Sequence, residues 1–238
     1  MGLILRIDVD KPYGNNNLFK KIISKLREDF YFPVINKFGY LKQVQNFAIL
    51  LHNHSVPAIF YFRNCTAPSQ SLIQWLETLG HSIGFHAENT KSFETFETEL
   101  KDFKSKTGLK KLHSFTKHES GVLKLGKNHH PPYEEEKYKG WAMKTETPFY
   151  FGNGEMSTFI VPEDKSFYPE MFWIEAGYRD LETMSIEKLI SEAKNEDYPL
   201  LIHPENYYAR QQTKFDFDKL LRLSKQVNVN WFVPPMHY

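Results

Sequence analysis

The sequence predicts an α/β fold, a distorted (β/α) barrel with about seven strands. Short apolar runs of strand length alternate with amphipathic stretches of helix length along most of the chain. Carboxylates and imidazoles stand at the carboxyl ends of several of these runs, where parallel α/β proteins carry their sites. The chain's 238 residues suit one large domain, expected to span 1–238. An open, doubly wound sheet is the alternative.

The strands are recognised by β-branched, aliphatic and aromatic residues between turn-forming residues. Strands are expected at 2–10, 56–63, 81–88, 109–118, 142–152, 172–178 and 198–204. The helices are recognised by apolar residues that recur every three or four positions. Helices are expected at 18–38 with a break near Pro33, and at 40–54, 71–80, 92–108, 185–195 and 216–227.

Capping residues support the helix at 92–108. Ser92 is the expected N-cap and Gly108 the expected stop signal. No glycine-rich phosphate loop follows any expected strand, and "GNNN" after the first one lacks the spacing and the lysine of such a loop. The sequence therefore gives no support for nucleotide binding.

Composition excludes several classes of function. The net charge is +1 and no cluster of Lys and Arg stands out, so nucleic acid is not an expected partner. No stretch is long and apolar enough for a membrane span, and no membrane association is expected. Cys65 is the single cysteine, which fits a reducing compartment. With no recognisable signal peptide at the start of the chain, we expect a cytoplasmic protein.

Four predicted strands end in residues that could carry chemistry. The first ends in Asp8 and Asp10, the third in His86 and Glu88, the fourth in His113 and His118, and the strand at 198–204 in His203. The carboxyl ends of parallel strands meet at one edge of the sheet, so these side chains are expected to converge.

Asp8 and Asp10 are the most informative pair. Residues two apart on a strand point to the same face, so the two carboxylates would repel each other unless a cation or a shared proton lies between them. A metal bound to Asp10, with Asp8 free as a base, would resolve this conflict. Mixed His and carboxylate ligands suit zinc, the metal we expect, and other divalent transition metals. The alternative is that both aspartates only make capping and turn contacts before "KPYG".

These residues and their order resemble the polysaccharide deacetylase family, the NodB-like carbohydrate esterases. The resemblance rests on "IDVD", "VPAIFYF", "LGHSIGFHAENT" and "LLIHPENYY", and spans residues 5 to about 208. It implies a distorted (β/α) barrel, Asp8 as catalytic base, Asp10 and His86 as metal ligands, and His203 as general acid. The family's second ligand histidine is replaced by Thr90, four positions after His86. Glu88 and His118 are the candidates to replace it, and His118 is preferred.

The resemblance implies metal-dependent hydrolysis of an N-acyl bond, such as an acetamide, on a carbohydrate or a related small amide. Contacts with substrate are expected from Glu88, His130 and Tyr133, the last two in the less regular middle of the chain. Two alternatives stay open. One is a catalytically inactive relative that binds carbohydrate, and the other is a small-molecule C–N amide hydrolase. The sequence does not indicate an oligomeric state.

Overall fold

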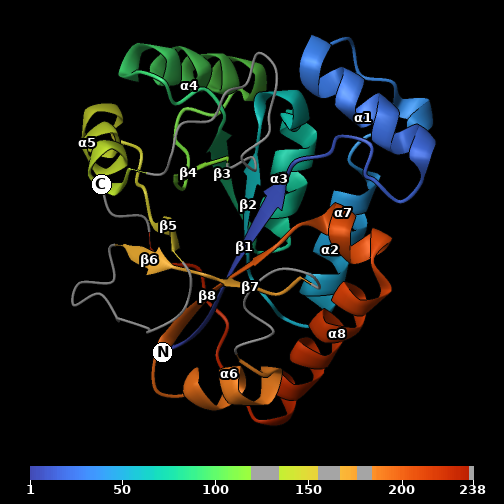
Figure 1. The fold of residues 1–238 in the computed structure, drawn as a ribbon, viewed down its shortest axis with the longest axis vertical. Coiled ribbons are helices and arrows are strands. Elements are labelled where there is room, and N and C mark those ends of the chain that lie inside the picture. The colour runs from blue at the N-terminus through green and yellow to red at the C-terminus, as the bar shows by residue number, and fades with distance from the viewer. Residues whose placement is uncertain (119–133, 155–166, 176–183, 236–238) are drawn as a thin grey trace.

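The fold is built on one curved parallel sheet (Figure 1). The computed structural model describes residues 1–118, 134–154, 167–175 and 184–235. The strand order is β4-β3-β2-β1-β8-β7, and every neighbouring pair is parallel. These strands are β1 (Gly2–Val9), β2 (Ile59–Phe62), β3 (Ser82–Ala87), β4 (Phe115–Lys117), β7 (Phe172–Trp173) and β8 (Asp197–Ile202).

A second, two-stranded sheet brings the two edges of the large one towards each other. It consists of β5 (Phe151–Gly154) and β6 (Tyr168–Glu170), which are parallel. A bridge between Phe115 and Phe149 connects β4 to the segment before β5, and only Met171 separates β6 from β7. The sheet is thus a curled half-barrel, which confirms the predicted distorted barrel. Within the described residues, counting β6 and β7 as one interrupted strand gives seven strands, the number expected.

Strand β1 lies at the centre and has two different faces. Its odd-numbered residues Leu3, Leu5, Ile7 and Val9 are fully buried in the larger hydrophobic cluster, together with residues from the helices. Ile4, on the opposite face, belongs to a smaller cluster with Tyr61 and Phe151 inside the curled sheet. Successive side chains of a strand alternate between faces, so Arg6, Asp8 and Asp10 continue the inner face towards the carboxyl end.

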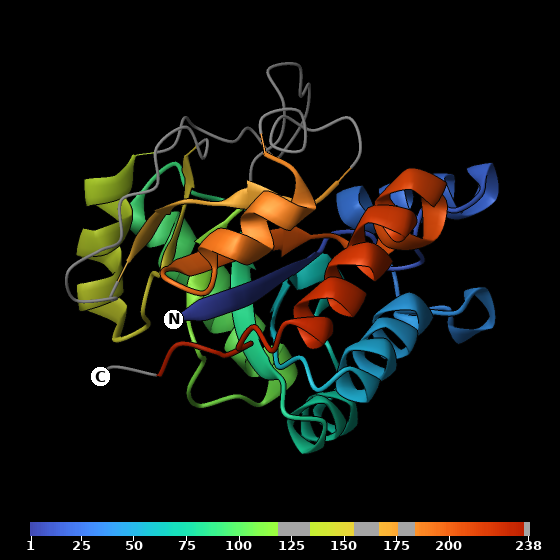
Figure 2. The same ribbon diagram turned by 90° about the horizontal axis from the view of Figure 1, so that it is seen from below.

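The helices cover the outside of the sheet (Figure 2). They are α1 (Leu18–Phe30), α2 (Lys42–Asn53), α3 (Gln70–Thr78), α4 (Phe93–Thr107), α5 (Glu135–Thr145), α6 (Ile186–Glu192), α7 (Pro204–Ala209) and α8 (Gln211–Gln226). Two 3-10 turns, η1 (Asn36–Phe38) and η2 (Asn64–Thr66), lie between them. Within the described parts of the chain, no helix combines the length and apolar character that crossing a membrane requires.

The predicted elements are mostly found, but the strand expected at 109–118 is confined to β4 (Phe115–Lys117), and β6 was not predicted. Ser92 caps α4 by accepting a hydrogen bond from the Thr95 N–H, and Gly108 ends that helix at φ 71°, as predicted. The strand expected at 142–152 is wrong in its first half, because residues up to Thr145 belong to α5, which buries Tyr138 and Trp141. The turn of helix α7 directly after β8 was not predicted.

Candidate metal centre

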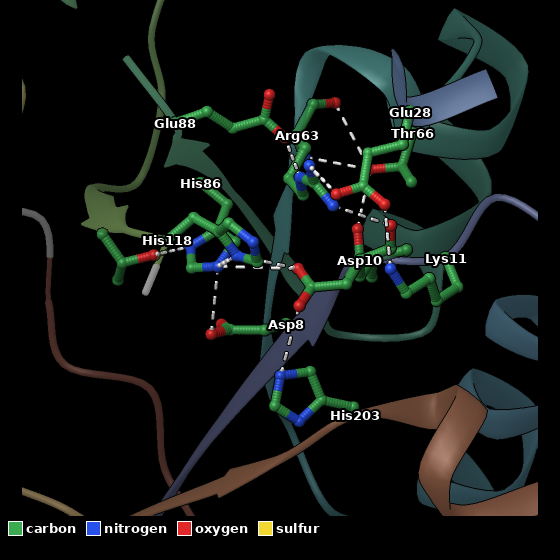
Figure 3. Close-up of polar contacts among 12 residues, drawn as sticks. Asp8, Asp10, Lys11, Glu28, Arg63, Thr66, His86, Glu88, His118 and His203 are labelled. Carbon is green, nitrogen blue, oxygen red and sulfur yellow. Dashed lines mark hydrogen bonds and ion pairs between the residues drawn. The ribbon is translucent and has the colours of Figure 1, made fainter. Parts of the chain in front are cut away.

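Side chains from four strand ends meet above the carboxyl end of the sheet (Figure 3). Asp10 follows β1, His86 lies near the end of β3, His118 follows β4, and His203 follows β8 as the N-cap residue of α7. All three histidines are at most 9% exposed. The hydrophobic runs that bury each strand therefore place these polar groups together at one end.

Three of these residues form a compact group of donor atoms. Nδ1 of His118 lies 3.0 Å from Nε2 of His86 and 3.4 Å from Oδ1 of Asp10. Nε2 of His86 lies 3.6 Å from the same carboxylate oxygen. An ion held at about 2.0–2.1 Å with tetrahedral angles would separate its ligand atoms by about 3.4 Å. The three spacings therefore fit a small divalent cation such as zinc.

The surroundings of the three donors also suit a metal. Oδ1 of Asp10 is buried and has no hydrogen-bond partner among the described residues. The other ring nitrogen of His86, Nδ1, is paired with the Thr116 hydroxyl at 2.7 Å, a contact that would fix the orientation of a ligand histidine. Burial lowers the pKa of both His86 and His118, which favours the neutral imidazole that metals bind. Burial opposes ionisation of Asp10, but His118, His86 and His203 together hold its pKa well below the ordinary value.

Asp8 has a different environment, dominated by Arg6. The Arg6 guanidinium donates from Nε to Oδ1 of Asp8 at 2.8 Å and from Nη2 to Oδ2 at 2.6 Å. Both residues are 2% exposed. Asp8 raises the pKa of Arg6 against the effect of burial, so the pair is a buried ion pair inside the curled sheet. Oδ2 of Asp8 also lies 3.4 Å from Nε2 of His86, so Asp8 borders the donor group.

His203 is held by a buried glutamate. Oε1 of Glu175 accepts hydrogen bonds from the backbone N–H of His203 at 2.6 Å and from its ring Nδ1 at 2.9 Å. The amide of Asn206 donates to the other oxygen of Glu175. Although burial works against it, Glu175 raises the pKa of His203 well above the ordinary value. The other ring nitrogen of His203, Nε2, faces Oδ2 of Asp10 at 3.5 Å, which directs a protonated nitrogen into the site.

A second buried charge network supports the cluster from behind. Arg63, which is fully buried, pairs with Glu88 and, at 3.0 Å, with Glu28 of α1. It also donates to the backbone carbonyl of Asp10 at 3.2 Å. Lys11 donates to Glu28 at 2.9 Å. These contacts fix the segment that carries Asp10.

The predicted site residues fall into three groups. Asp8, Asp10, His86, His118 and His203 are brought together, and their individual roles stay predictions. Glu88 lies apart from the donor group, where Arg63 and the Tyr31 hydroxyl bind it, and its contact with substrate also stays a prediction. His130 and Tyr133 lie outside the described residues.

Sequence reasoning missed four supporting residues, namely Arg6, Arg63, Thr116 and Glu175. A signal for two of them is visible. Arg6 is a charged residue inside an apolar strand, on the same face as Asp8, and Glu175 is an acid just after the apolar "MFWI". Nothing in the local sequence distinguishes Thr116 or Arg63, because their importance comes from neighbouring strands.

Structural comparison identifies proteins with the same fold. A probable polysaccharide deacetylase from Pseudomonas aeruginosa PAO1 superposes with a TM-score of 0.56 at 10% identity, covering 97% of this chain and 87% of that one. Puue allantoinase gives a TM-score of 0.55 at 11% identity, covering 97% and 86%. This chain therefore has the NodB-like deacetylase fold.

A CE4 family pseudoenzyme from Bacillus anthracis is also similar, with a TM-score of 0.47 at 13% identity and 97% of this chain covered. This chain spans 62% of that protein's length, less than two thirds. No family model matches the sequence, and no curated protein matches it.

Proposed function

We propose that the protein is a metal-dependent hydrolase that cleaves an N-acyl bond, as in an N-acetylated sugar or a related amide. The observation that carries the proposal is the donor group of Asp10, His86 and His118. Its three atoms lie 3.0 to 3.6 Å apart at the end of a NodB-like barrel. These residues would hold the ion, and His118 would stand in for the ligand lost at Thr90. The expected metal is zinc.

A bound divalent ion would supply Lewis-acid polarisation of the acyl carbonyl and would lower the pKa of a water molecule. The chain's own groups would handle the protons. Asp8, held in one orientation by Nε and Nη2 of Arg6, would accept the proton from the attacking water.

His203 would act at the other end of the reaction. Glu175 favours its protonated form, and its Nε2 faces the site, so it would donate a proton to the departing amine. Cys65 has no part in this scheme. It is buried, and burial raises the pKa of its thiol to about 12, which leaves it without thiolate character at neutral pH.

Two observations favour the alternative functions. The allantoinase superposes as well as the deacetylase does, which favours a small cyclic or linear amide as a second class of substrate. Both oxygens of Asp8 accept hydrogen bonds from Arg6, so this carboxylate is already engaged within the protein, which favours a protein that binds carbohydrate without cleaving it. The proposed compartment for this activity is the cytoplasm.

Metal content is the direct test. Purified protein, dialysed against zinc and then against buffer, is expected to retain about one ion per chain by elemental analysis. Asp10→Ala should lose the ion, and Asp102→Asn, on the exposed part of α4, should keep it. Wild-type protein that retains no zinc, cobalt or manganese would refute the proposal.

The substrate class is tested separately. The loaded protein should release acetate from N-acetylated sugars or ammonia or acid from small amides, and Asp8→Asn should stop either reaction. A protein that holds metal, binds sugar and cleaves neither class of compound would be the inactive relative.

A further inference from the structure

An open cavity, here called the η2 pocket, lies between the carboxyl end of α1, helix α3 and the turn η2. Its volume is about 860 Å³, within the range of about 300–1,000 Å³ that small-molecule sites occupy. None of the described residues that line it belongs to the donor group of Asp10, His86 and His118. The η2 pocket is therefore a second cavity, separate from the metal centre.

The charged side chains that line the η2 pocket are cations, Arg27 of α1 and Lys106 of α4. Among the described residues, no carboxylate forms an ion pair with Arg27. Lys106 pairs with Asp102 one helical turn away at 2.6 Å, but both side chains are exposed, and a pair of this kind is weak. Glu88, Glu99 and Asp102 line an adjoining cavity of about 250 Å³ and do not line the η2 pocket. A negatively charged ligand would therefore complement the η2 pocket.

The floor of the η2 pocket holds Arg27 in a fixed place. The Cys65 carbonyl of η2 accepts a hydrogen bond from Nε of Arg27 at 3.2 Å, and the guanidinium carbon lies 5.7 Å from the centre of the Tyr40 ring. The Thr66 hydroxyl donates to the Val9 carbonyl at 2.7 Å, which anchors the floor to the central strand β1. Because these groups are ordered without a ligand, binding would cost little conformational entropy.

Three aromatic side chains line the η2 pocket, namely Tyr31, Tyr40 and Trp75. The Tyr40 hydroxyl donates to the Ala67 carbonyl at 3.0 Å, and the Tyr31 hydroxyl donates to Glu88 at 3.1 Å. These two hydrogen bonds fix the orientation of both tyrosine rings. Fixed aromatic rings present large apolar surfaces to a ring-shaped ligand.

Amide and hydroxyl side chains complete the polar part of the lining. They are Asn36, Gln45, Asn64, Ser69 and Ser71. Such groups both donate and accept hydrogen bonds, as binding a compound with several hydroxyl groups requires. A ring, several hydroxyl groups and a negative charge occur together in sugar phosphates and in sugar acids such as uronic acids.

We propose that the η2 pocket binds an anionic sugar. The sugar ring would lie against the aromatic side chains, and its phosphate or carboxylate would bind Arg27 and Lys106. A neutral sugar would leave both cations without a counter-charge, and a simple anion would leave the aromatic surfaces uncovered. The proposal goes beyond the hydrolase activity and does not depend on it, because the metal donors lie outside this pocket.

Isothermal titration calorimetry with simple compounds tests the class of ligand. Glucose 6-phosphate and glucuronate are the anionic probes, and the tighter of the two identifies the preferred anion as a phosphate or a carboxylate. At least one of them is expected to bind about 10-fold or more tightly than glucose, which lacks the charge. Cyclohexanecarboxylate, which has a ring and a charge but no hydroxyl groups, should bind at least about 10-fold more weakly than glucuronate. Inorganic phosphate should bind at least about 10-fold more weakly than glucose 6-phosphate.

Variants test whether the sugar binds in the η2 pocket. Arg27→Gln and Lys106→Gln should each weaken binding of the preferred anionic sugar by about 10-fold. Lys106 is exposed, so Lys106→Gln should fold even if Arg27→Gln does not. Arg222→Gln, on the exposed side of α8, is the matched control and should bind like the wild type. Asp10→Ala should also bind like the wild type, because Asp10 does not line this pocket.

Four results would overturn the proposal. The first is a wild type that binds neither anionic sugar at millimolar concentration, and the second is unchanged affinity in Lys106→Gln. The third is binding of inorganic phosphate or cyclohexanecarboxylate as tight as that of the corresponding sugar. The fourth is loss of sugar binding in Asp10→Ala, which would place the sugar at the metal centre. Sugar binding that Asp10→Ala retains and Lys106→Gln weakens would support the η2 pocket even if the protein proved to be no hydrolase.

Discussion

Asp8 and Asp10 are two residues apart at the end of β1, and although both lie near Nε2 of His86, their other partners differ. Asp8 lies inside the curled sheet, where a guanidinium binds both of its oxygens. Asp10 lies at the rim, where three imidazoles surround it at 3.4 to 3.6 Å and one oxygen lacks a hydrogen bond. The protein satisfies the hydrogen bonding of Asp8 but not that of Asp10. This difference indicates that a ligand is needed at Asp10.

The largest effect is expected from removing the inner counter-charge. Arg6→Met leaves Asp8 buried without its partner, so the free energy of unfolding should fall by about 3–5 kcal/mol in urea titrations. The double variant Arg6→Met with Asp8→Asn should recover much of that loss, because no buried charge is left unpaired. Lys101→Met, which breaks the exposed pair with Glu97, is the control and should cost less than about 1 kcal/mol. Equal losses in Arg6→Met and Lys101→Met would show that the inner pair does not behave as a buried one.

A second prediction tests the effect of burial alone on a histidine that lies outside the donor group. His81, just before β3, is 3% exposed and faces the Ala48 carbonyl, far along the strand from His86. Burial lowers the pKa of His81 to about 4. A histidine with a depressed folded-state pKa stabilises the fold above the unfolded pKa of about 6.5, and this stability is lost as pH falls towards 4.

Replacing His81 should therefore flatten the pH dependence. The wild type should lose about 3 kcal/mol more than His81→Gln between pH 7 and pH 4 in urea unfolding. His52→Gln, on the exposed side of α2, should follow the wild-type curve. If His81→Gln and the wild type lose the same free energy of unfolding as the pH falls, burial does not lower the pKa of His81.

The smallest effect is expected from losing the contact that orients His86, the histidine beside the Asp10 carboxylate. Thr116→Val removes the hydroxyl that orients His86 and nearly keeps the side-chain volume. Zinc affinity should fall by about 10–100-fold in competition with a chelator, as is typical when a contact to a ligand histidine is lost. Thr98→Val on the exposed side of α4 is the matched control. Unchanged affinity in Thr116→Val would mean that His86 is oriented by other means or is not a ligand.

The sequence contained most of the fold and part of the site. Alternating apolar runs located β1, β2, β3 and β8, because buried parallel strands are continuous and apolar. The strand-end rule then selected Asp10, His86, His118 and His203. Helix α5 was misjudged because its "GWAMKT" has strand-like aromatic neighbours, while burial of Tyr138 and Trp141 determines its conformation.

The partners of the site residues could not be predicted because they are set by register between strands. Thr116 supports His86 only because β3 and β4 pair these two positions. Arg63, just after β2, contacts Asp10, Glu28 and Glu88, and no spacing in the sequence relates these four residues. The exposure of Leu18, Ile22 and Phe30 on α1 was also missed, since an amphipathic pattern does not tell which side of a helix faces the core.

The Arg63 contacts have a consequence for how the site meets its ligand. The chain from Asp10 to Glu28 is closed into a loop by Arg63, which holds the carbonyl at one end and the carboxylate at the other, with Lys11 as a cross-link to Glu28. Little conformational entropy is left in this loop for a ligand to remove. The Asp10 carboxylate is therefore preorganised, and the arrival of an ion would cost the protein almost no reordering.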